Sequence, residues 1–418
     1  MDEFVINGGK PLVGEVFISG AKNAVLPIMA ASIIKPAEYV IKNVPNLKDT
    51  RTMLTIIEST GAKVDFKNNI LFIDTRSCDK PVAPYDLVKT MRASFYMLGP
   101  FMSRFGKAIV SLPGGCAWGP RPVDFHIKAL EKMGAKINLK DGNIICDGKL
   151  KGAVIKFEKK SVGATGNTLM AASQANGPTQ ILNAACEPEI VDLCNFLKLL
   201  KVEIKGVGTS SLKIYPNKEK VSNIEYEVIP DRIEAGTFMI AALITKGDIT
   251  LKKINAEHLE SVSEKIKEAG GHITTIDDST IRIQYSGKVN SVDIETTEYP
   301  GYPTDLQAQW MALMTVSDGE SSVKENIYKD RFTHISELIR FGAEIAFNGN
   351  EALIKGKKEL VAAPVMSTDI RASASLILAA LSAKGKSNIS RIYHIDRGYE
   401  NIEFKIKSLG GEIFRIKS

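Results

Sequence analysis

The sequence predicts an α/β protein of two domains, each containing three repeats of about 70 residues. A chain of 418 residues is too long for one ordinary hydrophobic core. Along it, a helical spacing of apolar residues, a small-residue turn and a short β-branched segment recur six times. The turns start at Gly61, Gly134, Lys201, Gly270, Gly342 and Gly410, which are 73, 67, 69, 72 and 68 residues apart.

The turn residue explains how each repeat changes from helix to strand. Glycine there fits the C-terminal cap of a helix, and the β-branched residue after it begins a strand. Lys201 stands where the other five repeats have glycine. Further elements are expected as strands at Phe4–Ile6, Val16–Ile18, Ile70–Ile73, Ile144–Cys146 and Ile281–Gln284, and as a first helix from Lys22 through Ile34. The boundary between the domains is expected near Val221–Ile229.

The composition is that of a globular protein with a mild positive charge. Hydrophobic residues make up 44% of the chain and charged residues 24%, and 54 basic against 48 acidic residues give a net charge of +6. No basic run is interleaved with aromatic residues, so nucleic acid is not a favoured partner. An anionic small molecule is compatible with this charge.

The spacing of cysteine and histidine argues against disulfide and zinc frameworks. The five cysteines are odd in number without a C-x-x-C pair, and the five histidines show no metal-ligand spacing. The N-terminus lacks a signal-peptide pattern, and apolar runs such as Phe238–Ile244 are too short to span a membrane. We therefore expect a cytoplasmic protein with no metal and no membrane insertion.

A loop rich in glycine and proline, Pro113–Asp124, joins a predicted buried strand to a predicted helix. It contains Cys116 and Arg121, and a thiol near a permanent cation and a helix start can be reactive. The alternative is an ordinary strand-to-helix loop with an incidental cysteine, which this stretch taken alone favours.

Several helix starts carry residues that suit an anion. Lys22 and Asn23 open the first helix. Arg92 and Arg371 each precede small residues at a helix start, where an arginine can clamp an oxyanion with two hydrogen bonds. The loop Ser161–Thr168 offers hydroxyl and amide groups for a phosphate, although it is not a P-loop. The alternative for Lys22 and Asn23 is a plain helix start, and the alternative for the two arginines is an ion pair on the surface.

An acid and two further cations stand in the second half of the chain. Asp305 follows the rigid turn Pro300–Pro303, and it is either a general base or the N-cap of a helix that begins near Leu306. Arg331 and Arg397 add to the cations of both halves. Together these residues suggest one polyanionic substrate that the two domains hold between them.

Eight segments in order resemble the enolpyruvyl transferases, over essentially the full chain. They are Gly20–Asn23, Leu112–Cys116 with Arg121–Asp124, Ser161–Thr165, Glu187–Val191, Pro230–Thr237, Tyr299–Asp305, Asp369–Ser375 and Tyr393–Glu400. Each motif alone is weak, but the ordered set is specific. It is most similar to the branch of the family that acts on UDP-N-acetylglucosamine.

The resemblance implies two inside-out α/β barrels, each of three βαβαββ repeats with the helices inside. It also implies an N-terminal domain at 21–229 and a C-terminal domain at 230–418 that residues 1–20 complete. The implied reaction transfers the enolpyruvyl group of phosphoenolpyruvate to the 3′-hydroxyl of UDP-N-acetylglucosamine, through a tetrahedral ketal and with release of phosphate. This is the first committed step of peptidoglycan synthesis and needs no cofactor.

The resemblance also implies a role for each matching residue. Cys116 would protonate the enol methylene, form an adduct with phosphoenolpyruvate and be the target of fosfomycin, and Asp305 would accept the proton of the sugar hydroxyl. Lys22, Arg121 and Arg397 would clamp the anion. The other implied substrate contacts are Asn23, Arg92, Pro122, Val123, Asp124, Phe125, Lys159, Ser161, Val162, Gly163, Ile327, Arg331, Asp369 and Arg371.

Two other functions are considered. The shikimate-pathway enolpyruvyl transferase shares the fold and the donor, but it starts with Lys-Ser and lacks the Gly-Gly-Cys loop found here at Gly114–Cys116. A non-catalytic UDP-sugar sensor on the same scaffold would have lost Cys116, Asp305 or a clamp arginine, and all are present.

Overall fold

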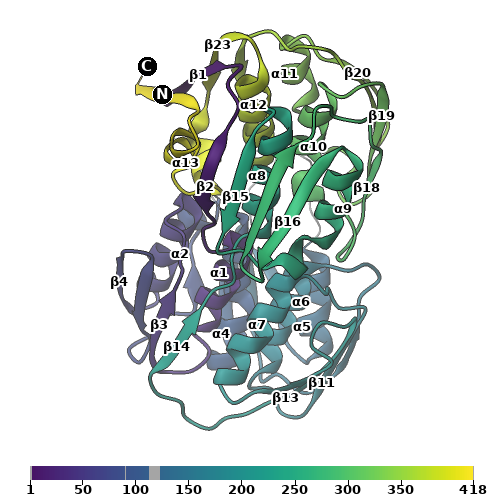
Figure 1. The fold of residues 1–418 in the computed structure, drawn as a ribbon. Coiled ribbons are helices and arrows are strands. Elements are labelled where there is room, and N and C mark those ends of the chain that lie inside the picture. The colour runs from purple at the N-terminus through teal and green to yellow at the C-terminus, as the bar shows by residue number, and fades with distance from the viewer. Residues whose placement is uncertain (1, 90, 113–122, 418) are drawn as a thin grey trace. The chain divides into compact units, whose positions relative to one another are not determined.

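The structure, a computed structural model, describes residues 2–89, 91–112 and 123–417 (Figure 1). The chain forms two compact units: unit 1 comprises 1–19 with 230–418, and unit 2 comprises 20–229. The limits expected from the sequence differ at one residue, Gly20, which belongs to unit 2. A Cβ atom on Gly20 would lie 1.7 Å from the carbonyl oxygen of Asn43, so only glycine fits there.

Unit 2 contains three four-stranded sheets with one shared pattern, in which a parallel pair is extended by two antiparallel strands. Their strands, in spatial order, are β14 (Ile224–Glu227), β3 (Glu38–Lys42), β5 (Ile70–Asp74) and β4 (Lys63–Lys67); β6 (Val82–Ala83), β7 (Lys107–Ser111), β9 (Asn143–Asp147) and β8 (Lys136–Lys140); and β10 (Val154–Lys156), β11 (Thr179–Leu182), β13 (Ser211–Tyr215) and β12 (Glu203–Lys205).

Unit 1 repeats this pattern three times. Its sheets are β2 (Val13–Phe17), β15 (Asp248–Lys252), β17 (Thr280–Tyr285) and β16 (Gly271–Asp277); β18 (Ile294–Thr296), β19 (Glu320–Glu325), β21 (Glu351–Lys355) and β20 (Glu344–Asn348); and β22 (Pro364–Met366), β23 (Gly385–Ser390), β1 (Asp2–Gly8) and β24 (Glu412–Lys417).

Three of the six repeats follow the βαβαββ order along the chain, and the same α/β architecture in the other three confirms the predicted fold class. Three strands reach their sheets from distant parts of the sequence. β14 pairs in parallel with β3, and β2 pairs in parallel with β15. β1 lies between β23 and β24, where it completes the last repeat. Unit 1 is therefore discontinuous in sequence, and its first 19 residues supply two strands.

The first helix of each repeat is buried on nearly all sides, which explains why its sequence is apolar all round. These helices are α1 (Lys22–Ala31), α4 (Leu98–Phe105) with η1 (Arg92–Met97) before it, α6 (Val162–Ala172), α8 (Arg232–Ile244), α10 (Gln307–Met314) with η3 (Thr304–Leu306) before it, and α12 (Ile370–Ser382). In Figure 1 the strands of unit 2 lie outside α1 and α4.

The second helix of each repeat keeps a solvent-exposed face. These helices are α2 (Lys48–Ser59), α5 (Asp124–Lys132), α7 (Pro188–Leu199), α9 (Glu260–Glu268), α11 (Ile335–Arg340) and α13 (Ile402–Ser408). Short helical turns at α3 (Tyr85–Val88), η2 (Ala256–Leu259) and η4 (Ile392–Arg397) complete the described elements.

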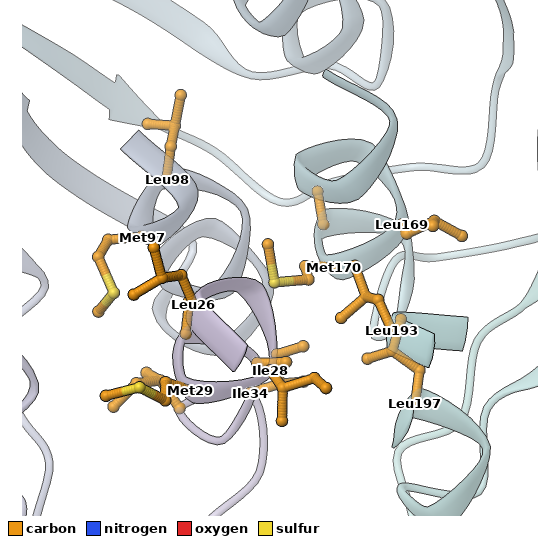
Figure 2. Close-up of a cluster of buried hydrophobic side chains, with 14 of the residues drawn as sticks. Leu26, Ile28, Met29, Ile34, Met97, Leu98, Leu169, Met170, Leu193 and Leu197 are labelled. Carbon is orange, nitrogen blue, oxygen red and sulfur yellow. The ribbon is translucent and has the colours of Figure 1, made fainter. Parts of the chain in front are cut away.

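Each unit has its own hydrophobic core. Figure 2 shows part of the core of unit 2, where Ile28 of α1, Met170 of α6 and Leu193 of α7 are fully buried. Burial of one such side chain stabilises the fold by about 1.5–3 kcal/mol. In unit 1 the indole of Trp310 on α10 is fully buried, and its N–H donates to the carbonyl of Val292 at 3.2 Å.

The six turn positions identified from their spacing all follow a second helix and all have positive φ, which confirms the predicted caps. The five glycines have φ between 83° and 101°, and Lys201 has φ of 62°. The first helix, in contrast, ends at Ala31 rather than Ile34. The backbone N–H groups of Ile33 and Ile34 donate to carbonyls only three residues back, so the chain tightens before Pro36.

Candidate active site

Three of the predicted site residues meet directly in unit 1: Asp305, Arg331 and Arg371. Asp305 Oδ1 accepts a hydrogen bond from Arg331 Nη1 at 2.8 Å, and Oδ2 accepts one from Arg371 Nη2 at 2.6 Å. The side chains of the two arginines are only 6% and 5% exposed, whereas that of Asp305 is 24% exposed. One carboxylate thus lies between two buried cations, at the edge of a buried region.

The two arginines determine the protonation state of Asp305. Burial alone would raise the pKa of its carboxyl group, but the charges and hydrogen bonds of Arg371 and Arg331 outweigh burial and hold that pKa well below its usual value. Asp305 is therefore ionised in this arrangement, and it is a weak base as long as both arginines bind it.

Helix capping does not explain Asp305. Three aspartates precede the first helices of unit 1, and two of them are N-caps: Asp231 accepts backbone hydrogen bonds in the first turn of α8, and Asp369 accepts those of Arg371 and Ala372 at 2.7 and 3.0 Å. Asp305 lies inside η3, and neither η3 nor α10 has a side-chain cap. The N-cap alternative for Asp305 is therefore wrong, and its carboxylate binds the arginines instead.

A fully buried acid, Glu325, supports this group, although sequence reasoning did not find it. Its Oε2 accepts from Thr304 Oγ1 at 2.9 Å, and Thr304 Oγ1 in turn accepts from Arg331 Nη1 at 2.9 Å. Its Oε1 accepts from the backbone N–H of Ile327 at 2.8 Å. The available signal was the alternation along β19, which puts Glu325 on the same buried face as Val323.

Arg397 lies at the end of η4, which packs against α12. The close approach depends on the next residue, because a Cβ atom on Gly398 would lie 2.4 Å from Ile370 Cγ2 and 3.8 Å from Arg371 Nη1. Arg397 is half-buried, and Gly398 after it lies against the helix start that carries Asp369 and Arg371.

In unit 2, Lys22 is the first residue of α1, as predicted, and Asn23 follows it on the exposed side. The ammonium group of Lys22 lies 2.9 Å from Asp49 Oδ2, and these side chains are 12% and 3% exposed. Sequence reasoning missed Asp49. An acid in the first turn of a helix is common, because it interacts favourably with the helix dipole, and so it does not by itself indicate a functional site.

The N-terminus of α6 is a second predicted anion site in unit 2. Ser161 caps it and accepts from the backbone N–H of Ala164 at 3.3 Å. The N–H groups of Val162 and Gly163 are in the first turn, where a helix offers them no internal acceptor. Exposed Lys159 precedes this turn.

The beginning of α5 lies against α6. A Cβ atom on Gly163 would lie 3.2 Å from the imidazole of His126, so glycine permits this contact. Asn167 of α6 is within 2.7 Å of His126 Nδ1 and donates to the carbonyl of Phe95 at 3.0 Å. The packing positions the predicted contacts Val123, Asp124 and Phe125 at the start of α5.

The remaining predicted residues are only partly described. Arg92 is the first residue of η1, which packs against α1 and α6, but its side chain lies outside the description. Cys116, Arg121 and Pro122 lie outside the described residues. Within the described part of the chain, no three His, Cys, Asp or Glu side chains are grouped to ligate a metal ion. None of the helices described there has the length and apolarity needed to cross a membrane.

Comparison with known proteins adds a family to this geometry. The family model described as EPSP synthase (3-phosphoshikimate 1-carboxyvinyltransferase) matches residues 6–406. The chain belongs to the EPSP synthase family. Among its relatives in this family, UDP-N-acetylglucosamine 1-carboxyvinyltransferase from Geotalea uraniireducens is 52% identical over all of both chains. The protein of the same name from Campylobacter jejuni (strain 81-176) is 50% identical over 99% of both.

Two solved structures have the same fold as this chain. The enolpyruvyl transferase NikO from Streptomyces tendae superposes with a TM-score of 0.91 at 21% identity, and covers 100% of this chain and 99% of its own. EPSP synthase from Acinetobacter baumannii superposes with a TM-score of 0.77 at 17% identity, and the match covers all of both chains. At these identities the similarity concerns the fold alone.

Proposed function

We propose that this protein transfers the enolpyruvyl group of phosphoenolpyruvate to the 3′-hydroxyl of UDP-N-acetylglucosamine and releases phosphate. The observation that carries the proposal is the Asp305 carboxylate held between two buried arginines, in a chain half identical, from end to end, to proteins named for that transfer. A nucleotide sugar and phosphoenolpyruvate are soluble intracellular metabolites, so we assign the reaction to the cytoplasm, at the first committed step of peptidoglycan synthesis.

The donor needs several cations, because phosphoenolpyruvate carries a carboxylate and a phosphate. Arginine binds such groups with paired, charge-assisted hydrogen bonds. Lys22, Arg121 and Arg397 serve as its clamp in this proposal. Arg331, Arg371 and Arg92 complete the positive charge around the substrates.

The acceptor is a UDP-sugar, and unit 2 offers it two helix starts. The uracil binds along Arg121–Phe125, and the nucleotide phosphates bind Lys159, Ser161, Val162 and the open N-terminus of α6. Asn23 of unit 2 and Ile327 and Asp369 of unit 1 are further substrate contacts.

Donor binding switches Asp305 from a weak base to a usable one. Each guanidinium group that turns to an anionic substrate leaves the carboxylate with one partner fewer, so the pKa of Asp305 rises toward its ordinary range. The carboxylate then accepts the proton of the 3′-hydroxyl as the oxygen bonds to C2 of phosphoenolpyruvate. This sequence of events protects the reaction from a premature proton transfer.

Cys116 supplies the proton in the other half of the addition. Its thiol protonates C3 as the new C–O bond forms at C2, which gives the tetrahedral ketal. Elimination then removes a proton from C3 and breaks the bond between C2 and the phosphate oxygen. The same thiol, as thiolate, forms the adduct with phosphoenolpyruvate and reacts with the epoxide fosfomycin.

The test is phosphate release by the purified protein. Phosphate should appear only when phosphoenolpyruvate and UDP-N-acetylglucosamine are both present, with a carboxyvinyl product confirmed by mass spectrometry. Phosphate release with shikimate 3-phosphate in place of the UDP-sugar would assign the protein to the other branch of its family. No release with either acceptor, together with tight binding of UDP-N-acetylglucosamine, would indicate a sensor and reject the proposal.

A further inference from the structure

Next to the ion pair of Asp305 and Arg371 lies a cluster of three uncharged polar side chains. Thr237 comes from α8, Gln309 from α10, and Tyr399 follows η4; they are 3%, 0% and 2% exposed. The mechanism above uses none of them. Buried polar groups are costly unless they are hydrogen-bonded, so the arrangement of this cluster calls for a physical reason.

The donors and acceptors of the cluster fix its hydrogen bonds in one direction. Thr237 Oγ1 donates its only proton to the carbonyl of Ile233 at 2.8 Å, so it must accept from the hydroxyl of Tyr399, also at 2.8 Å. The hydroxyl of Tyr399 accepts from Gln309 Nε2 at 3.0 Å. Gln309 Nε2 also donates to the backbone carbonyl of Asp305 at 3.0 Å.

Tyr399 also contacts the other member of the ion pair. The Cζ atom of Arg371 lies 5.5 Å from the centroid of the Tyr399 ring, within the range of a cation–π interaction. Gln309 therefore holds the main chain of Asp305, while the Tyr399 ring holds the guanidinium of Arg371. Gln309 Nε2 joins these two supports through the Tyr399 hydroxyl at 3.0 Å and through Thr237 Oγ1 at 3.2 Å, which itself accepts from that hydroxyl.

We propose that Gln309 and Tyr399 are positioning residues, which hold the Asp305 main chain and the Arg371 guanidinium in the free enzyme so that both groups are in place when Arg371 turns to the donor and Asp305 accepts the proton. The inference rests on the proposed function, since it concerns the base of that reaction. A charge-assisted contact of 2.6 Å tolerates little displacement. A misplacement of about 1 Å at a reacting group can lower a rate about 100-fold.

Several charged or titratable groups surround this pair. Arg331 and Arg371 face Asp305 directly. Burial lowers the pKa of His334 to about 4, so that imidazole stays neutral above about pH 5. The other charged neighbours are Glu325 through Thr304, Asp231 beside Arg371 and Tyr399, and Asp369 beside His334.

The decisive variant is Gln309→Met, which keeps an unbranched side chain and removes both donors. Its matched control is Gln307→Met, because Gln307 is on the same helix, is equally buried and bonds to Met311 Sδ at 3.3 Å rather than to the cluster. Both variants should lower the melting temperature by a similar amount. Tyr399→Phe keeps the ring over Arg371 and removes only the hydroxyl. It should lower kcat by more than Gln307→Met does and by less than Gln309→Met does.

In turnover, Gln309→Met should lower kcat about 10- to 100-fold, leave the KM for UDP-N-acetylglucosamine within about twofold, and move the acid limb of kcat/KM for phosphoenolpyruvate, which reports the enzyme before the donor binds, to higher pH. The limb moves up because a less firmly held Arg371 depresses the pKa of Asp305 less. Gln307→Met should keep kcat within about threefold. A merely structural role would lower the melting temperature without any of these changes.

A second readout needs no turnover, so failure of the proposed function and failure of this inference are distinguishable. The ¹⁵N–¹H signals of the Arg371 guanidinium, assigned with Arg371→Lys, should be sharp in the unaltered protein and in Gln307→Met, and broadened in Gln309→Met. Sharp signals in Gln309→Met, or none in the unaltered protein, would overturn the inference. So would an unchanged kcat in Gln309→Met when the unaltered protein is active.

Discussion

The buried acids of this protein differ in their partners, and the partners decide what each acid can do. Asp305 lies between two arginines, which keep it charged. Glu234 is fully buried against Lys405, and burial nevertheless raises its pKa. Asp192 on α7 has no ion pair with a cation of the described residues; its carboxylate accepts from the hydroxyl of Tyr226, and burial raises its pKa to about 7. Of these three acids, only Asp305 is held charged by groups that an anionic substrate can draw away, which would let it act as a base.

Asp192 gives a prediction for pH. Between its ordinary pKa and about 7, the folded protein keeps a proton that the unfolded chain has lost, so stability falls as pH rises through this window, by at most about 1.4 kcal/mol per pH unit. Asp192→Asn cannot ionise, so it should gain stability relative to the unaltered protein between pH 5 and 8 in urea unfolding. Asp86→Asn, at an exposed site of unit 2, is the control, and it should not gain stability over this pH range. Equal slopes in all three proteins would contradict the assignment.

At the scale of elements, the recurring unit is a helix that ends in a left-handed residue and turns into a strand. Five repeats use glycine there, because L side chains pay a conformational cost at positive φ. The exception, Lys201, gains an ion pair with Glu219 at 2.8 Å. That pair is exposed and adds at most about 1 kcal/mol, so it only offsets the cost of the backbone.

The two kinds of turn can be compared directly. Gly410 has φ of 85°, and a Cβ atom on it would have no neighbour within 4 Å, so Gly410→Ala should cost about 1 kcal/mol through the backbone alone. Lys201→Gly should leave the free energy of unfolding unchanged or raise it by up to about 1 kcal/mol, because relief of the backbone offsets the lost ion pair. Chemical denaturation of both variants measures this, and a loss of similar size at both positions would show that the turn conformation is not the cause.

At the scale of the whole molecule, the four described cysteines have one property in common, a raised pKa. Burial raises the pKa of Cys146 and Cys194 to about 12, and it also raises that of Cys78 and Cys186. A thiol with a raised pKa carries little thiolate at neutral pH, and the thiolate is the reactive form. None of these four is therefore prepared to react with an electrophile.

The proposed role of Cys116 thus predicts one adduct per chain. Fosfomycin at about pH 7.5 should add one equivalent to the folded protein, at Cys116 by peptide mapping, and abolish phosphate release. Cys116→Asp should take no adduct and keep turnover, because a carboxylic acid can still donate the proton, whereas Cys116→Ser should lose nearly all turnover. A second equivalent, or an adduct at half-buried Cys186, would contradict this role.

The repeated architecture follows from the sequence alone. The period of the turns from Gly61 to Gly410 predicted six α/β repeats, because positive φ and helical periodicity are local constraints that leave a local trace. The ordered motifs also identified the family and contained Asp305 and Arg371, since each motif is a short contiguous stretch, and the family resemblance added Arg331. The periodicity, however, could not predict that β14 pairs with β3 across more than 180 residues.

Which side chains act together is a property of the tertiary structure. The fold separates Asp305 from the helix-capping aspartates Asp231 and Asp369, although all three precede a helix in the same way. It also adds Glu325, Asp49 and Gln309, which look like ordinary strand or helix residues in the sequence. The physical reason is that a hydrogen bond or an ion pair depends on distances of about 3 Å between groups from distant segments, and no local pattern encodes those distances.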